Sequence, residues 1–269
     1  MATGPRYFVL VLLPVLLAGL LANAPAAAAA PIRYPDLKSL VPESDLAIGY
    51  ESGRKVLQFT HVIFNAGEGP LEIRPEYDPA TDMARGFQRL YTVDGAGHLD
   101  LAQEVPIADG RLLFFWHAPH RHYHFPIAQH GLYEVTAGGQ VGAPVSMSPK
   151  LGYCLSDSAL IETRDLSPPD DVYGGDRCVN PNRIIGVSAG WGDIYRWWEP
   201  GQSIDVGDVP DGFYWFRSTV DPDHYLIESD KTNNTTDVLV RIQGDSVRAV
   251  HEPAVMPGVS SRAQGGGAE

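Results

Sequence analysis

The chain carries its plainest fold signal at residues 213–220, which read FYWFRSTV. Tyr214, Phe216 and Val220 recur at even spacing, so in an extended strand they lie on one face. β-branched and aromatic residues are enriched in strands because they pack well on a pleated, half-buried surface. The stretch therefore predicts a half-buried β-strand.

Similar segments recur on both sides of this stretch, and clusters of Gly, Pro, Asn and Asp separate them. They are Lys55–Phe64, Pro70–Arg74, Arg111–Trp116, Gly131–Thr136, Gln202–Val206 and Thr236–Ile242. No long amphipathic helix pattern is present in the sequence. The spacing predicts an all-β fold, an antiparallel β-sandwich, with long functional loops between about Ser156 and Gly201.

The ends of the chain read differently from its middle. Arg6, an apolar run from Tyr7 to Ala22 and an alanine-rich stretch to Ala30 form the pattern of a secretory signal peptide. We expect residues 1–30 to be that signal, 31–252 a single catalytic β domain and 253–269 a disordered tail. This organisation predicts a secreted protein with no stable membrane anchor after signal cleavage.

The formal net charge of −13 excludes nucleic acid as a natural partner and favours basic partners through long-range steering. The chain has two cysteines, Cys154 and Cys178, which in an oxidising compartment most simply form one disulfide. Such a bond would stabilise the fold by roughly 3 kcal/mol. The alternative, a cysteine metal ligand, lacks the usual closely spaced cysteine pair.

The sequence WHAPHRHYH at residues 116–124 holds four of the chain's nine histidines, and His130 follows six residues later. Neutral imidazole is the commonest side-chain ligand for copper, zinc and nickel, whereas calcium and magnesium prefer oxygen. Three histidines around a metal with an open position suit catalysis rather than a closed structural site. The segment therefore predicts a metal site of one of these three ions.

The spacing of the histidines restricts how they can bind one ion. His120, His122 and His124 share one face of a strand, but a straight strand would put the outer two Cα atoms about 13 Å apart. We therefore expect a curved or irregular backbone here. If the segment is straight, two of the three bind and His117 or His130 completes the site.

The motif resembles the copper-binding segment of lysyl oxidases, including its tryptophan and the tyrosine between its last two histidines. Further segments are similar to that family in the same order, over roughly Lys55 to Ile242. They read QHGLY (129–133), KLGYCLSD (150–157), GWGDIY (190–195), DVPDGFY (208–214), VDP (220–222) and ESDKTNN (228–234). Animal lysyl oxidases carry more cysteines than the two present here.

The resemblance implies a Cu(II)-dependent amine oxidase whose second cofactor is a lysine tyrosylquinone. By position, Lys150 and Tyr195 would form the quinone, while His120, His122 and His124 would bind copper. Such an enzyme uses O₂ to convert primary amines, either small or as lysine in a basic protein, to aldehydes, with release of hydrogen peroxide and ammonia. Lysine adds to a ring only as the neutral base, so Lys150 would need a lowered pKa.

Three residues compete for the role of catalytic base. His130 lies close in sequence to the metal segment and can exchange protons near neutral pH. Asp157 and Asp193 flank the two cofactor precursors. We name His130 and Asp193, with Lys150 and Tyr195, as the candidate catalytic residues.

Other functions also agree with the sequence. A non-enzymatic secreted copper- or zinc-binding sandwich would keep the three histidines but have no use for Lys150 and Tyr195 as a pair. An adhesive sandwich would use the histidines as a structural metal clip. A cupin-type dioxygenase fits less well, because Glu134 is too distant from the histidines to be its carboxylate ligand.

Overall fold

The computed structural model describes residues 1, 30–110, 112–117, 122–149 and 152–251. The predicted C-terminal tail lies outside these ranges, and so does the predicted signal peptide except for Met1 and Ala30. His120 and Lys150 also lie outside them. No helix in the described ranges is long and apolar enough to cross a membrane.

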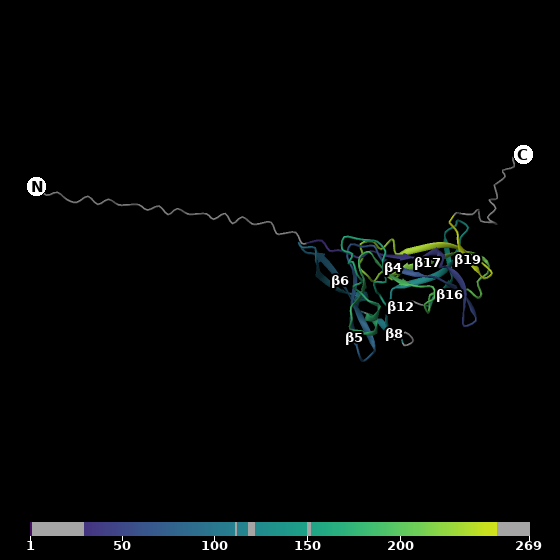
Figure 1. The fold of residues 1–269 in the computed structure, drawn as a ribbon, viewed down its shortest axis with the longest axis horizontal. Helices are drawn as coiled ribbons and strands as arrows, with labels where there is room; N and C mark the ends of the chain where they lie inside the picture. Colours follow the sequence, from purple (N-terminus) through teal and green to yellow (C-terminus); the bar gives the residue numbers. More distant parts are fainter. Residues whose placement is uncertain (2–29, 111, 118–121, 150–151, 252–269) are drawn as a thin grey trace.

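The regular elements of the described chain are almost all β-strands, which confirms the predicted all-β class (Figure 1). The strands are β1 (Leu37–Leu40), β2 (Ala47–Glu51), β3 (Arg54–Gln58), β4 (His61–Asn65), β5 (Leu71–Asp78), β6 (Met83–Val93), β7 (Leu99–Pro106), β8 (Leu112–His117), β9 (His122–Pro126), β10 (Ala128–Val135), β11 (Val141–Met147), β12 (Gly152–Tyr153), β13 (Ala159–Leu160), β14 (Ile185–Val187), β15 (Trp191–Tyr195), β16 (Ser203–Asp205), β17 (Gly212–Val220), β18 (Thr235–Gln243) and β19 (Ser246–Ala249). Three short 3-10 helices join them: η1 (Glu43–Asp45), η2 (Ile107–Gly110) and η3 (Gly175–Val179).

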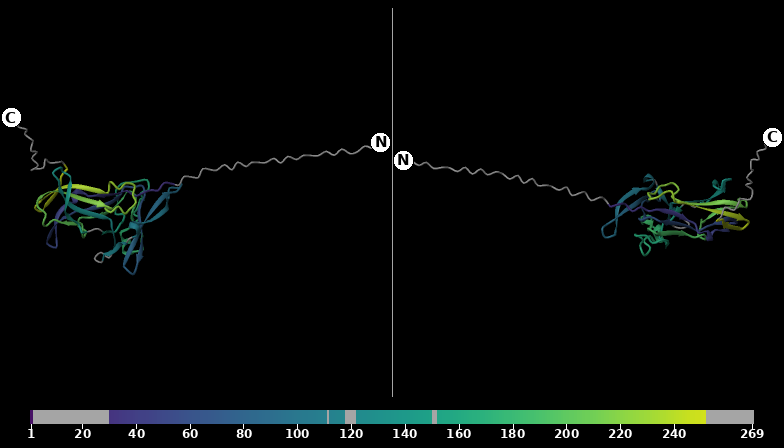
Figure 2. Two further views of the ribbon diagram at one scale, coloured as in Figure 1. Left: turned by 180° about the vertical axis from the view of Figure 1, so that it is seen from behind. Right: turned by 90° about the horizontal axis from the view of Figure 1, so that it is seen from above.

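The strands form four sheets, and their pairings are antiparallel. The orders are β1-β4-β15-β13, β11-β10-β17-β18-β19, β12-β9-β8-β6-β5-β14 with β7 beside β6, and β16-β3-β2. The sheet that contains β5, β6 and β8 lies at one end of the molecule, and β17 and β19 lie toward the other (Figures 1 and 2).

The predicted strand over residues 213–220 is confirmed as β17, which pairs along its length with both β10 and β18. The predicted single strand Lys55–Phe64 is wrong, because the chain changes sheet between Gln58 and His61. At this point the amide of Phe59 donates to the carbonyl of Gln202, and its side chain is fully buried. The sequence does not indicate this break, because residues typical of strands continue from β3 through to β4.

Buried apolar side chains form two main clusters. The first includes Leu37, Ile63, Ala128 and Val220. The second includes Val41, Phe59, Leu132 and Phe216. Each of these eight residues lies two positions from a buried polar residue on the same segment.

Those four buried polar residues are Ser39, His61, His130 and Ser218, each at most 1 % exposed. Strand side chains alternate with a period of two, so residues two and four positions apart lie on the same face. In each segment that face carries an apolar residue of one cluster, then the polar residue, then an apolar residue of the other cluster. We call this group the polar seam. It lies where the two clusters meet.

Glu228 fastens the loop before β18 to the start of β1. Its carboxylate accepts hydrogen bonds from the Leu37 amide at 2.6 Å and from the Asn234 side chain at 3.0 Å. Burial raises the pKa of Glu228 to about 7. In the folded protein this carboxyl therefore keeps its proton at pH values where the unfolded chain has lost it.

The free energy of unfolding should fall as pH rises from about 4.5 to about 7, because only the folded state still binds the proton there. The contribution of Glu228 is on the order of 2–3 kcal/mol. Urea unfolding at pH 5 and pH 8 measures this loss of stability. Glu228→Gln should make the loss of stability between pH 5 and pH 8 smaller. Glu76→Gln, at an exposed strand position, should leave that loss as large as in the parent. An equal loss in the parent and Glu228→Gln would show that Glu228 is not responsible.

Candidate functional site

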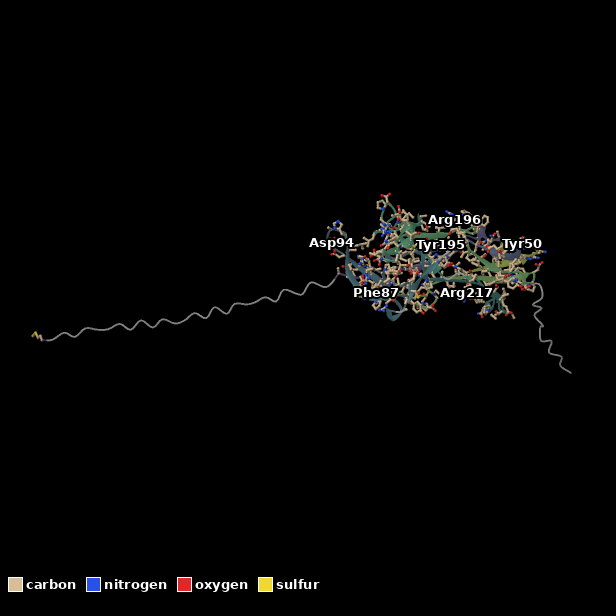
Figure 3. The ribbon with its side chains drawn as sticks, turned by 90° about the horizontal axis from the view of Figure 1, so that it is seen from below. Tyr50, Phe87, Asp94, Tyr195, Arg196 and Arg217 are labelled. Carbon is tan, nitrogen blue, oxygen red and sulfur yellow. A yellow bond between two sulfur atoms is a disulfide. The ribbon has the colours of Figure 1, made fainter. Side chains whose placement is uncertain are left out.

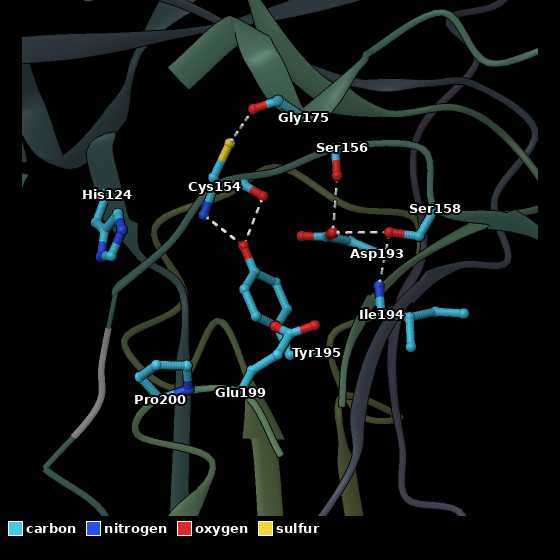
Figure 4. Close-up of a pocket in the computed structure, with 10 residues that line it drawn as sticks. All are labelled: His124, Cys154, Ser156, Ser158, Gly175, Asp193, Ile194, Tyr195, Glu199 and Pro200. Atoms are coloured by element: carbon cyan, nitrogen blue, oxygen red, sulfur yellow. Dashed lines mark hydrogen bonds between the residues drawn. The ribbon is translucent and has the colours of Figure 1, made fainter. Parts of the chain in front are cut away.

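A cavity of about 430 Å³ brings together the main sequence-predicted site residues that the structure describes (Figure 4). His124 of β9, Asp193 and Tyr195 of β15, and Glu199 all border it. Its remaining lining residues are Cys154, Ser156, Ser158, Gly175, Ile194 and Pro200. Tyr195 lies near the middle of the molecule, between the end that carries Phe87 and the end that carries Tyr50 (Figure 3). A cavity of this size suits a small ligand.

The backbone of Cys154 holds the hydroxyl of Tyr195. The hydroxyl donates to the Cys154 carbonyl and accepts from the Cys154 amide, both at 2.7 Å (Figure 4). Burial raises the pKa of Tyr195 well above its ordinary value, and the charge of Asp193 adds to the effect. A hydroxyl that donates to a carbonyl must carry its proton. The site therefore holds Tyr195 as a neutral phenol.

A disulfide anchors this arrangement from the other side. Cys154 is bonded to Cys178 at the end of a loop with a sequence separation of 24 residues, which confirms the predicted pairing. Cys178 lies in η3 and is buried in the first apolar cluster. The peptide that binds Tyr195 is thus covalently tied to the core.

Asp193 and Asp157, the two aspartates weighed as bases, have different surroundings. Asp193 is buried on the wall of the cavity and accepts from the hydroxyls of Ser156 at 3.0 Å and Ser158 at 3.3 Å. Asp157 does not line the cavity, and it fastens two loops instead. It accepts from the amides of Val172, Tyr173 and Ser188 and from the Ser188 hydroxyl, between 2.8 and 3.2 Å. Asp157 has the contacts of a structural residue.

His130 lies behind the cavity and is not among its lining residues. It is fully buried, and its Nε2 lies 2.6 Å from the hydroxyl of Tyr153. The Tyr153 ring in turn contacts the Tyr195 ring, with centroids 4.7 Å apart. His130 therefore reaches Tyr195 through Tyr153.

The predicted metal segment is described in part. β9 begins at His122, whose backbone pairs with that of His117, while His124 pairs with Phe115. His120 and Lys150 lie outside the described residues, and of the three predicted ligands only His124 has a described side chain. It is 7 % exposed and contributes one imidazole to the cavity. Among the described side chains no three potential metal ligands come together.

Glu199, Tyr153 and the two serines on Asp193 were not predicted from the sequence. Glu199 lines the cavity beside Tyr195 and also raises its pKa. Its backbone bonds to Arg196 and Gln202, whereas its carboxylate makes no hydrogen bond or ion pair with the part of the chain that the structure describes. One signal could have pointed to Glu199, because Pro200 directly after it indicates a turn that follows the predicted tyrosine strand.

Known protein families provide an independent comparison. The family model described as lysyl oxidase matches residues 81–251, which is more than half of the chain. The chain belongs to the lysyl oxidase family. The matched range includes His124, Tyr153, Asp193 and Tyr195. It begins after Lys55, at which we placed the start of the resemblance.

Individual relatives within the lysyl oxidase family are distant. Lysyl oxidase homolog 2 of Gallus gallus is 29 % identical over 182 residues, which cover 66 % of this chain and 22 % of the relative. The proteins of that name from Xenopus tropicalis and Homo sapiens are 30 % and 28 % identical over 168 residues, each covering 62 % of this chain and 20 % of the relative. The chain thus spans about a fifth of the length of these relatives.

The contacts of Asp157 predict a large effect on stability. Asp157→Ala removes the acceptor for three amides and a hydroxyl, so the free energy of unfolding should fall by about 3 kcal/mol. Asp170→Ala, at an exposed position in the same loop region, should change it by less than about 0.5 kcal/mol. Chemical denaturation measures both values. Equal stability of the two variants would contradict the structural role of Asp157.

Proposed function

We propose that this protein is a secreted copper-dependent amine oxidase that converts primary amines to aldehydes, with release of hydrogen peroxide and ammonia. The observation that carries the proposal is the shared cavity of His124, Asp193 and Tyr195. These residues come from segments about 70 positions apart in the sequence. The lysyl oxidase resemblance gives His124 and Tyr195 parts in one reaction, and Asp193 is a candidate base because it lies two positions from Tyr195. A shared cavity is what a common reaction requires.

The residues fit the cofactors that the family implies. His124 offers an imidazole donor at the cavity, on the strand that begins with His122. We propose that His120, His122 and His124 bind Cu(II), and that Lys150 and Tyr195 form a lysine tyrosylquinone. Cys154, which holds the Tyr195 hydroxyl, follows Lys150 by only four positions in the sequence. Bound copper would supply redox chemistry with O₂, and the quinone would accept the electrons of the amine.

The described side chains supply the remaining parts of the reaction. The carboxylates of Asp193 and Glu199 make the cavity favourable for a cationic amine. Asp193, positioned by the Ser156 and Ser158 hydroxyls, is the candidate for removing a proton from the substrate carbon next to nitrogen. The acidic net charge of −13 favours amines carried by basic molecules, whether small amines or lysine in a basic protein.

Tyr195→Phe provides the most direct functional test. The variant should keep its copper but lose quinone staining and amine turnover, because phenylalanine lacks the oxygen needed to start ring oxidation. Tyr214→Phe is the matched control, since the Tyr214 hydroxyl also donates to a backbone carbonyl, that of Pro210 at 2.8 Å. A redox-cycling stain and a peroxide assay measure the result.

Staining of the parent and Tyr214→Phe, but not Tyr195→Phe, supports the assignment. Turnover in Tyr195→Phe would rule out the proposed cofactor. A parent that binds copper but never stains or turns over would favour a non-enzymatic metal-binding protein.

The metal assignment makes a separate prediction. His120→Ala, His122→Ala and His124→Ala should each lower bound copper from about one ion per chain and block quinone formation, because each removes a ligand. His98→Ala, at an exposed loop position, should bind copper like the parent. Metal analysis after dialysis gives the stoichiometry. Full copper content in any of the three ligand variants would remove that histidine from the site.

A further inference from the structure

The polar seam continues as a hydrogen-bonded chain that ends at the candidate site. The Ser39 hydroxyl donates to the Ser218 hydroxyl at 2.6 Å. Ser218 lies 2.9 Å from Nδ1 of His130, and Nε2 of His130 lies 2.6 Å from the Tyr153 hydroxyl. All four residues are at most 1 % exposed. The chain thus joins β1, β17, β10 and β12.

Both ring nitrogens of His130 are hydrogen-bonded. Burial raises the pKa of Tyr153, so its phenol stays protonated beside Nε2 of His130. A neutral His130 carries one ring proton, so one of its two nitrogens donates and the other accepts. His61 packs edge-on against His130, with ring centroids 4.5 Å apart, and Phe59 lies at 4.8 Å. Tyr153 is therefore held at its hydroxyl by a ring that cannot easily move.

The hydrogen bonds of the Tyr195 hydroxyl do not set the plane of its ring. The hydroxyl is bound by Cys154, but its oxygen lies on the axis about which the ring turns. These bonds fix the oxygen and do not themselves resist rotation of the ring about that axis. Such rotation would move the two ring carbons next to the hydroxyl, where the quinone chemistry would take place.

Tyr153 supplies that second contact. Its ring meets the Tyr195 ring at an interplanar angle of 83°, with centroids 4.7 Å apart. This edge-to-face arrangement lies within the favourable range for aromatic pairs. A neighbour on one side of a ring raises the barrier to rotation about its axis, because the turning edge would collide with it.

We propose that Tyr153 is the positioning residue that fixes the plane of the Tyr195 ring, and that His130 acts on the site through Tyr153 rather than by touching substrate. The part of this inference that concerns quinone formation rests on the proposed function. The part that concerns the ring plane does not, because it applies to the unmodified, metal-free protein.

Carbon-13 NMR of the metal-free protein tests the ring plane directly. Tyrosine labelled at both ring carbons next to the hydroxyl gives two signals from a slowly rotating ring and one from a rapidly rotating ring. Tyr195→Phe identifies the Tyr195 signals by their loss. We expect two Tyr195 signals in the parent and one averaged signal in Tyr153→Leu. The same Tyr195 ring-flip rate in both proteins would overturn the proposal.

The rate of quinone formation after copper addition tests the chemical consequence. Tyr153→Leu should slow this rate by about 100-fold, because small misplacements of reacting groups cost rates of this order. Tyr153→Phe keeps the ring but loses the bond to His130, and it should slow the rate by about tenfold. Copper content should match the parent in both variants.

Tyr173→Phe is the matched control for a general loss of stability. Tyr173 is also a buried tyrosine, and its hydroxyl donates to Glu72 at 2.7 Å, away from the cavity lining. It should form quinone at the parent rate even where its melting temperature falls as far as that of Tyr153→Phe. If quinone formation were as slow in Tyr173→Phe as in Tyr153→Phe, the effect of Tyr153 would be a loss of stability and not of positioning.

A double-mutant cycle tests the route from His130. If His130 acts through Tyr153, His130→Leu should slow quinone formation about tenfold alone and add nothing to Tyr153→Phe. If His130→Leu fails to fold, His130→Gln is used in its place. A further loss in the double variant would mean that His130 acts on the reaction directly.

These outcomes separate the inference from the proposed function. A parent that never forms quinone contradicts the function, while the NMR experiment still decides the ring plane. A parent that forms quinone at the same rate as Tyr153→Leu contradicts positioning and leaves the function intact.

Discussion

The period of two along a β-strand is the constraint on which the rest of this structure depends. Four segments each send one residue into the first apolar cluster and another, four positions away, into the second. The residue between them must face the junction of the clusters, and in all four it is polar. Ser39, His61, His130 and Ser218 therefore share one buried place. Buried polar groups are stable only when hydrogen-bonded, and three of these four join one chain of hydrogen bonds.

The candidate site lies beside this seam and against the first cluster, to which Cys154 belongs. β15 pairs with β4 so that Tyr195 lies opposite His61, a seam residue. Tyr195 is then held at its hydroxyl by Cys154 and at its ring by Tyr153. The disulfide bonds Cys154 to the apolar core, and the hydrogen bond between Tyr153 and His130 connects Tyr153 to the polar seam. A tyrosine with both contacts fixed would be preorganised before the proposed cofactor forms.

The sequence predicted the all-β class, the disulfide and three residues of the cavity because each had a local signal. Alternating side chains marked β17, and the histidine motif drew attention to His124. It missed β6 and β7. Half-buried charged residues such as Arg89, which pairs with Glu104 of β7, interrupt the apolar pattern of β6, and no residue of β7 is fully buried. It missed Glu199 and the contact of Tyr153 with Tyr195 because these depend on how distant strands meet. Asp157 and Asp193 also differ in role because of their tertiary contacts, which cannot be predicted from the spacing of residues in the sequence.

Peptide mapping by mass spectrometry shows whether Lys150 and Tyr195 become parts of one cofactor, as we propose. The exported, copper-loaded protein would be reduced, digested and compared with the same protein prepared without copper. We expect a cross-linked peptide pair that contains Lys150 and Tyr195 only in the copper-loaded sample, with both linear peptides depleted. Unmodified linear peptides for both residues, in a sample with full copper content, would contradict it.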